Sequence, residues 1–358
     1  MKLIIANSVF QLLEAIQLKR TILVQDKVNL ILSNLSPTLR EIYDRHVLED
    51  LFEHVNYVEI SPYNYAVKLF LNPYLALKYY LKEEPILYTD IFFWNNDYII
   101  YNYMKWYHIK KNDCKYHLYG DAASSYIIDA PDHGRKGIYR KEKKYYRLKN
   151  YIDINHFDYE SIAKKECDYY IFKKDLYMER TARTLLEIPP IDVGNQEICQ
   201  LLNLAFGYKE YRVKQKFIYL DTARNGFIKD EDVYNVLRYI VDCVGKDNLL
   251  IKPHPRNDLK FYERLGVELF DKDVPWEVFC LNNDISDKVI ICEITSAAVM
   301  PYLLFDYQYR VISVLGMIPS THPQKDLFIR LYNKINEKQK LVEFVENQSQ
   351  LENALQNA

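Results

Sequence analysis

Short apolar runs alternate with segments of helical periodicity along the first part of the chain. The runs at 2–6, 28–34 and 55–60 have the length of buried strands. The segments at 7–20 and 37–52 place apolar residues three or four positions apart, which is typical of amphipathic helices. The order strand, helix, strand, helix, strand predicts a parallel sheet covered by helices.

The first sheet continues along the chain until a junction rich in proline. Apolar runs at 85–94, 115–121 and 168–178 predict its later strands. A Pro-Pro pair at 189–190 then precedes a predicted helix that ends before Gly207. We place the boundary between two domains at this junction.

After the junction the alternation of strands and helices repeats. The sequence therefore predicts an α/β fold with two Rossmann-like domains, the first over 1–190 and the second over 191–358. The predicted strands of the second domain are 216–223, 248–254, 288–295 and a final one at 310–316; its predicted helices are 230–245, 258–266, 275–283, one from 296 and a charged amphipathic one from 325.

Composition limits the class of protein. The 358 residues are 49% hydrophobic with a net charge of −2, which fits a globular protein and gives no general signal for nucleic acid. Six cysteines without a CxxC pair argue against a zinc ribbon and favour reduced, mostly buried thiols. No apolar run reaches the ~18 residues of a membrane span, and the first residues indicate a strand and a helix rather than a signal peptide. A cytoplasmic protein is expected.

The stretch 135–149 departs from the small net charge of the whole chain, because it carries eight Lys or Arg residues interleaved with tyrosines. Such a stretch can lie against an anionic membrane, which would place the protein at the inner face of the cell membrane. It can also bind an anionic glycan, or form an ordinary solvated face. Nucleic acid is disfavoured because no matching fold signature accompanies the charge.

A predicted strand ends in the sequence Lys252-Pro253-His254-Pro255-Arg256. In open α/β sheets, ligands bind just beyond the carboxyl ends of the strands. The two prolines restrict the backbone on either side of the histidine, so the imidazole is held in a stiff extended loop. An imidazole between two cations suits a phosphate group, and a turn with an incidental histidine is the alternative.

A second strand end carries two hydroxyl groups, Thr295 and Ser296, followed by small residues that open a predicted helix. A turn of this kind presents backbone N–H groups and hydroxyls to an anion. An ordinary helix cap is the alternative. Because both strand ends fall in the predicted second domain, they favour one anionic ligand there.

Asp121 ends a predicted strand of the first domain, where the small residues of 118–126 leave space. A carboxylate at such an edge can act as a general base. A turn aspartate that binds its own loop amides is the alternative. His117 and Asp129 are weaker candidates for the same role.

These segments, in this order, resemble the bacterial sialyltransferases of the GT-B type. They are most similar to glycosyltransferase family 52, which includes lipooligosaccharide and capsule sialyltransferases, and to the related polysialyltransferases. That group carries an acidic-acidic-Gly motif, then a His-Pro motif, then a Ser/Thr pair. The His-Pro motif is intact at His254 and the hydroxyl pair is Thr295-Ser296, and the segments 7–16 and 274–279 also resemble the family.

The acidic-acidic-Gly motif departs from the family pattern, because it reads Gly120-Asp121-Ala122. The second acid of the motif, which is the catalytic one in the family, remains as Asp121. The resemblance therefore still implies Asp121 as the base, in an altered neighbourhood.

The resemblance implies a GT-B architecture with a cleft between the domains, the first on the acceptor side and the second binding the nucleotide sugar. It implies inverting transfer of sialic acid from CMP-sialic acid to a glycan hydroxyl, in capsule or lipooligosaccharide synthesis, without a metal or other cofactor. Asp121 would take the acceptor proton, and His254 would stabilise, or protonate, the leaving phosphate. The candidate nucleotide- and phosphate-binding residues are Lys252, Pro255, Arg256, Pro275, Glu277, Thr295 and Ser296.

Other functions are compatible with the same residues. The scaffold can use a UDP- or GDP-hexose donor. A CDP-polyol phosphotransferase of the teichoic-acid type also combines a His-Pro loop with a later Ser/Thr turn. A non-catalytic glycan- or nucleotide-binding subunit would explain the altered Gly120-Asp121-Ala122 motif. The expected partners are a nucleotide-sugar donor and a glycan or lipid-linked glycan acceptor, and the sequence is compatible with an oligomer.

Overall fold

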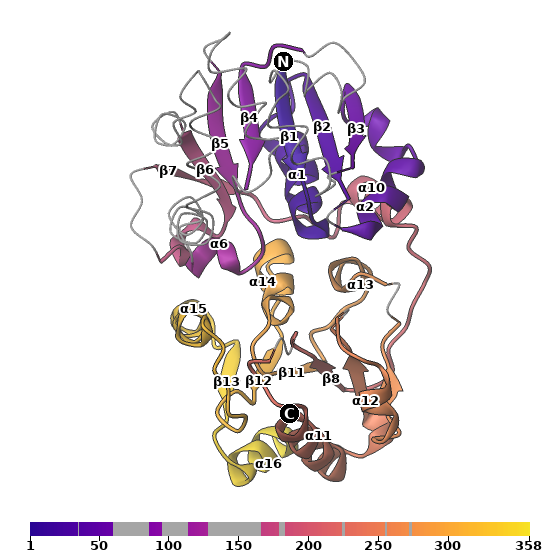
Figure 1. The fold of residues 1–358 in the computed structure, drawn as a ribbon, viewed down its shortest axis with the longest axis vertical. Helices are drawn as coiled ribbons and strands as arrows, with labels where there is room; N and C mark the ends of the chain where they lie inside the picture. Colours follow the sequence, from indigo (N-terminus) through magenta and orange to yellow (C-terminus); the bar gives the residue numbers. More distant parts are fainter. Residues whose placement is uncertain are drawn as a thin grey trace, which may run out of the picture. The chain divides into compact units, whose positions relative to one another are not determined.

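The computed structural model describes residues 1–34, 36–59, 86–94, 114–127, 166–178, 183–223, 226–254, 256–271 and 274–358. The chain forms two compact units (Figure 1). The N-terminal unit comprises Met1–Pro189 and Leu204–Gly207, and the C-terminal unit comprises Pro190–Asn203 and Tyr208–Ala358. Helix α10 (Gln196–Phe206) therefore contributes residues to both units.

Among the described residues, the N-terminal unit is built on a parallel sheet with the strand order β3-β2-β1-β4-β5-β6-β7 (Figure 1). Ile4 of β1 pairs with Leu30 on one side and Phe92 on the other, so β1 lies in the interior of the sheet. The strands are β1 (Lys2–Ala6), β2 (Val28–Ser33), β3 (His54–Val58), β4 (Asp90–Phe93), β5 (Lys115–Tyr119), β6 (Glu166–Phe172) and β7 (Thr184–Ile188).

Helix α1 (Val9–Thr21) is more deeply buried than its sequence pattern predicts. It begins at Ser8, whose hydroxyl accepts a hydrogen bond from the Gln11 backbone N–H. Every side chain from Phe10 to Leu18 is buried, so the expected solvent-facing side does not exist. The helix therefore carries polar side chains into the interior of the unit. The other helices among the described residues of Met1–Pro189 are α2 (Pro37–Asp44), η1 (Val47–Asp50), α6 (Ser124–Ile127) and η3 (Lys174–Leu176).

The C-terminal unit has a second parallel sheet with the order β10-β9-β8-β11-β12-β13 (Figure 1). The strands are β8 (Phe217–Leu220), β9 (Leu249–Lys252), β10 (Glu268–Leu269), β11 (Val289–Cys292), β12 (Arg310–Ser313) and β13 (Val342–Phe344). Besides the first part of α10, the helices among the described residues of this unit are α11 (Asp230–Val244), η4 (Lys246–Asn248), α12 (Lys260–Glu263), α13 (Trp276–Asn282), η5 (Ser296–Ala298), α14 (Met300–Phe305), α15 (Lys325–Lys338) and α16 (Gln348–Gln356).

Both sheets confirm the predicted α/β fold of two Rossmann-like domains. In chain order each sheet begins 3-2-1-4-5-6, so its strand order reverses beside its first strand. This reversal lies between β1 and β4 in one sheet and between β8 and β11 in the other. Ligands of such sheets bind beyond the carboxyl ends of the strands near that point.

The prediction of a final strand at 310–316 is wrong, because β13 and α16 follow it. Strand β13 is only three residues long, so its sequence contains no apolar run of the length typical of a strand. Strand β13 pairs with β12 and so lengthens the sheet, and α16 packs beside α11. One core cluster joins Leu237, Ile251, Ile312 and Leu351 from these elements, so the last residues of the chain belong to the core of the C-terminal unit.

Gly316 lies where the chain leaves β12 and passes close to the end of β13. A Cβ atom at this position would lie 2.7 Å from the Val345 carbonyl oxygen and 3.0 Å from the Glu346 Cα. Both neighbours are backbone atoms, which move less easily than a side chain. We expect Gly316→Ala to lower the free energy of unfolding by about 1–3 kcal/mol, measured by urea titration.

Gly194→Ala is the matched control, because a Cβ there would meet only the side-chain oxygen of Asp192, at 3.2 Å. We expect a change of less than about 0.5 kcal/mol for the control. Equal effects of the two substitutions would contradict the close backbone approach at Gly316.

Candidate functional site

The ends of three adjacent strands of the C-terminal sheet are joined by hydrogen bonds just past their carboxyl ends. After β8, the Asp221 backbone N–H donates to the Lys252 carbonyl at 3.0 Å. The Thr222 hydroxyl donates to the Ile294 carbonyl on the other side, at 2.7 Å. The segments that carry His254 and Thr295 therefore leave strands that flank β8, at a strand separation of about 10 Å.

The orientation of the His254 ring is fixed by its own loop. The Arg256 backbone N–H donates to Nδ1 of His254 at 3.2 Å, and the Asn257 N–H donates to the His254 carbonyl at 2.9 Å. A ring nitrogen that accepts a hydrogen bond carries no proton, so Nε2 is the N–H group of the neutral imidazole. Arg256 itself is exposed, and Pro255 lies outside the described residues.

The predicted hydroxyl pair lies in a turn between β11 and η5. The Thr295 hydroxyl accepts from the Ala297 N–H at 3.3 Å, which leaves its own proton available for donation. The Tyr332 hydroxyl donates to the Thr295 carbonyl at 2.9 Å, and Trp276 Nε1 donates to the Ala297 carbonyl at 2.9 Å. The indole bond brings the start of α13, with Pro275 and Glu277, to this turn.

Lys252 and Glu277 are half-buried groups of opposite charge that interact electrostatically beside the same strand ends. Burial lowers the pKa of Lys252, and the Glu277 carboxylate offsets part of that decrease. Burial raises the pKa of Glu277. The Lys252 Nζ also lies 4.6 Å from the centre of the Phe270 ring. The cation predicted to bind an anion is thus already balanced in part by a protein carboxylate.

A buried carboxyl pair beneath these loops was missed at the sequence level. Asp221 accepts hydrogen bonds from the Asn257 amide and from the Tyr262 hydroxyl, and Glu293 accepts one from the Tyr219 hydroxyl. Asn257 also donates to the Thr222 carbonyl at 2.8 Å, so it connects the His254 loop to β8. Burial raises the pKa of Glu293 to about 7, and the charge of Asp221 adds to the increase.

In the N-terminal unit, Asp121 lies in the turn after β5. The Ser8 hydroxyl donates to its Oδ1 at 3.2 Å, so Asp121 contacts the start of α1. Burial raises the pKa of Asp121 to about 6, and hydrogen bonds from Ser8 and Gln11 oppose that increase. The half-buried carboxylate has the environment of a base that works near neutral pH.

Glu14 is a second carboxyl group behind this turn, and no sequence motif indicated it. It is fully buried in α1, and neither of its oxygens has a hydrogen-bond partner among the described residues. A Cβ on Gly120 would lie 2.7 Å from Glu14 Oε1, so the acid occupies the space that a side chain at position 120 would need. Burial and the charge of Asp121 raise the pKa of Glu14 well above its usual range, which favours the protonated form of this acid.

The structure gives other predicted features a different setting or does not describe them. His117 is buried, with Nε2 at 3.0 Å from Asp90 and Nδ1 at 3.4 Å from Asp168, so it belongs to an internal ion-pair cluster. Among the described cysteines, Cys114, Cys280 and Cys292 are buried, as expected for most of the thiols, Cys199 is half-buried and Cys243 is exposed. The basic stretch 135–149 and Asp129 lie outside the described residues.

Two further properties concern only the part of the chain that the structure describes. No helix there is both long and apolar enough to cross a membrane. No three side chains among histidine, cysteine, aspartate and glutamate cluster there in a way that could hold a metal ion.

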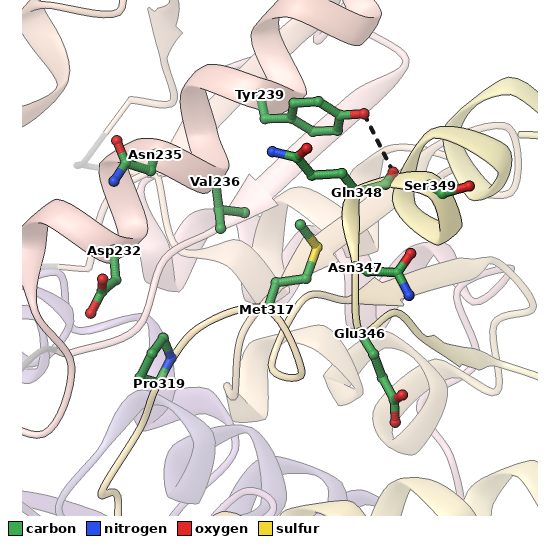
Figure 2. A pocket seen from close by; sticks show the side chains of 10 residues that line it. All are labelled: Asp232, Asn235, Val236, Tyr239, Met317, Pro319, Glu346, Asn347, Gln348 and Ser349. Carbon is green, nitrogen blue, oxygen red and sulfur yellow. Dashed lines mark hydrogen bonds between the residues drawn. The ribbon is translucent and has the colours of Figure 1, made fainter.

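A surface hollow of about 670 Å³ lies between α11, the loop after β12 and the start of α16 (Figure 2). None of the predicted site residues lines it. Its charged side chains, Asp232 and Glu346, are both acidic, and its remaining polar groups are amides and hydroxyls. This hollow does not suit a phosphate group, so the strand ends around His254 are the better candidate for an anionic ligand.

No protein-family model matches the chain, and no curated protein matches its sequence. Solved structures do share its fold. The GT-B domain of a sialyltransferase from Photobacterium damselae is 13% identical, with coverage of 96% of this chain and 100% of that chain and a TM-score of 0.53. The UDP-GlcNAc 2-epimerase from Methanocaldococcus jannaschii is 11% identical, with 99% and 92% coverage and a TM-score of 0.55.

A structure of S. aureus MnaA with UDP is 10% identical, with 99% and 87% coverage and a TM-score of 0.53. Identities this low show the fold alone. The chain therefore has the GT-B type of fold, which transferases share with epimerases, and the resemblance to family 52 stays a prediction.

The Glu293 carboxyl group makes the stability of the C-terminal unit dependent on pH. Its folded-state pKa of about 7 exceeds the unfolded value of about 4.3, so the folded state holds the proton more tightly. The parent protein then loses stability as the pH rises from about 4 to about 7. We expect Glu293→Gln to gain stability relative to the parent over this window, by up to about 3 kcal/mol in urea titrations.

The exposed Glu337→Gln is the control, and its difference from the parent should not change with pH. A Glu293→Gln difference that stays constant over the same range would show that Glu293 ionises normally in the folded protein.

Proposed function

We propose that the chain is a glycosyltransferase that moves sialic acid from CMP-sialic acid to a glycan hydroxyl, in capsule or lipooligosaccharide synthesis. The observation that carries the proposal is the His254 ring, whose Nδ1 accepts from the Arg256 N–H and whose Nε2 is therefore the donor. An N–H donor at the carboxyl end of a strand near the reversal of strand order suits a phosphate oxygen. The GT-B fold is compatible with this use.

The reaction we propose is a single displacement. The acceptor oxygen attacks the anomeric carbon of the sugar from the face opposite CMP, while the Asp121 carboxylate takes the hydroxyl proton. The bond from the anomeric carbon to the phosphate oxygen breaks, and its electron pair leaves with CMP. His254 Nε2–H and the hydroxyls of Thr295 and Ser296 donate to the phosphate as its charge grows, and the proposal assigns no metal.

The nucleoside part of the donor would lie beside the start of α13. Trp276 Nε1 ties this helix to the turn of Thr295 and Ser296, so Pro275 and Glu277 are close to the proposed phosphate position. Lys252 and Arg256 would add positive potential on the His254 side. A UDP-sugar donor is the second candidate, because MnaA, which has this type of fold, is described with UDP.

Ligand binding and turnover in one variant series test the proposal. We expect CMP to raise the melting temperature more than UDP, GDP or CDP, because a ligand of the folded state stabilises it. His254→Ala should weaken CMP binding but not cytidine binding, and should slow CMP release from CMP-sialic acid at least about tenfold. His254→Gln should keep more activity than His254→Ala, because its amide N–H can replace Nε2–H.

The control is His54→Ala, on the exposed surface of the N-terminal unit. Stabilisation by UDP or GDP alone would support a hexose donor. CMP release only from CDP-glycerol would support a polyol phosphotransferase. Nucleotide binding without turnover would support a non-catalytic binding subunit. Normal activity of His254→Ala would remove His254 from the reaction.

The pH dependence of turnover tests the role of Asp121. Because burial raises its pKa to about 6, the base is ionised only above that value, and kcat/KM should fall as the pH drops through about 6. Ser8→Ala removes a hydrogen bond that lowers this pKa, so the acid limb should move to higher pH. Steady-state kinetics across the acid range measure both effects.

Asn347→Ala is the control, since Asn347 also caps a helix by accepting from the Gln350 N–H at 3.0 Å. Loss of this cap should leave the acid limb in place. An acid limb near the pKa of an exposed carboxylate, or one that Ser8→Ala does not move, would mean that Asp121 is not the base.

A further inference from the structure

The chain contains two His-Pro dipeptides, and the second, His322-Pro323, has no role in the reaction described so far. It lies in the loop between β12 and α15. The Gln324 backbone N–H donates to Nδ1 of His322 at 3.2 Å, which repeats the arrangement of Arg256 and His254. Both rings therefore carry their N–H at Nε2 in the neutral state.

The Nε2 donor of His322 has no acceptor in the part of the chain that the structure describes. The side chain is half-buried. The ring packs edge-on against Phe227, with 5.4 Å between the ring centres, and the Ser320 hydroxyl accepts from the His322 backbone N–H at 3.2 Å. Burial lowers the pKa of His322, which favours the neutral ring with its single donor.

The two histidine loops hold opposite ends of the segment between β8 and α11. Asn257, from the first loop, donates to the Thr222 carbonyl at the start of that segment. Thr321, from the second loop, donates its backbone N–H to the Phe227 carbonyl at the end of the segment, at 3.0 Å. His322 is thus placed at the same carboxyl edge of the sheet as His254.

The order of the strands determines where the His254 loop and the His322 loop lie relative to the turn of Thr295 and Ser296. Along the edge the strands run β9, β8, β11, β12, so the turn of Thr295 and Ser296 lies between the strands that lead to His254 and to His322. A phosphate bound at that turn would have one imidazole on the β9 side and the other on the β12 side. The group attached to the phosphate is then the natural ligand of His322.

We propose that His322 binds the carboxylate of the donor sugar through its Nε2–H, and so selects an anionic sugar over a neutral hexose. This inference rests on the proposed function, because it assumes that a nucleotide sugar binds with its phosphate between the two loops. CMP-sialic acid carries two anionic groups, a phosphate and a carboxylate, and the chain offers one locked imidazole donor for each.

The test compares three ligands, of which two differ only at the carboxylate. CMP lacks the sugar, CMP-sialic acid carries the carboxylate, and its methyl ester carries the sugar without that charge. We expect His322→Ala to weaken the binding of CMP-sialic acid by roughly 10-fold or more, as for a lost hydrogen bond to a charged group. Affinity for CMP should stay within about twofold. Titration calorimetry without acceptor measures all three.

The methyl ester separates direct contact from a structural effect. The parent should bind the ester more weakly than the acid, whereas His322→Ala should bind the two equally. His322→Gln should restore part of the preference for the acid, and it decides the matter if the alanine variant does not fold. A preference that persists in both variants would overturn the assignment of His322.

The outcome also distinguishes this inference from the proposed function. If the parent binds CMP no better than cytidine, the nucleotide site itself is wrong. If the parent binds CMP and CMP-sialic acid as expected but His322 substitutions leave the preference for the acid intact, only the assignment of His322 fails.

Discussion

The candidate nucleotide site depends on how polar groups are satisfied where the order of strands reverses in the C-terminal sheet. The carboxyl groups of Asp221 and Glu293 are both buried there and interact electrostatically. A buried charge without a partner is costly. Asp221 is retained at that position by hydrogen bonds from Asn257 and Tyr262. The same bonds tie the His254 loop to the end of β8, so satisfying the buried acid also fixes the loop.

In the N-terminal unit, a buried acid likewise limits which residues fit nearby, at Gly120-Asp121-Ala122. Gly120 stands where the resembled motif has an acid, and the space of that side chain is filled by Glu14 from α1. Ala122 stands where the motif has glycine and keeps a positive φ of 54°, a conformation that glycine adopts more easily. Both positions thus have a physical explanation in this structure, and Glu14 of α1 places a second carboxyl group near Asp121.

The sequence predicted the strands that are long and apolar and the loops that follow them. Residues 249–254 show why, since an apolar run, two prolines and a histidine are all local signals. Strand β10 has two residues and β13 three, which is too short for any periodicity to appear. No local pattern indicates Glu14, Asp221, Asn257 and Glu293, because the groups beside them in the fold are distant in sequence. The pattern of 7–20 predicts an amphipathic helix, whereas the full burial of α1 depends on tertiary packing.

The hydrogen bonding of His254 also constrains how the proposed reaction would proceed. Protonating Nδ1 of His254 would require breaking the bond from the Arg256 N–H, so the structure favours the neutral ring as a hydrogen-bond donor over the imidazolium as an acid. A departing phosphate monoester does not need the proton, because its second pKa is about 6 and the dianion is stable at neutral pH. Fixed donors that meet the growing charge are then sufficient, and they require no change of protonation state during the reaction. In such a site the geometry of the loops, rather than the basicity of the histidines, would set the rate.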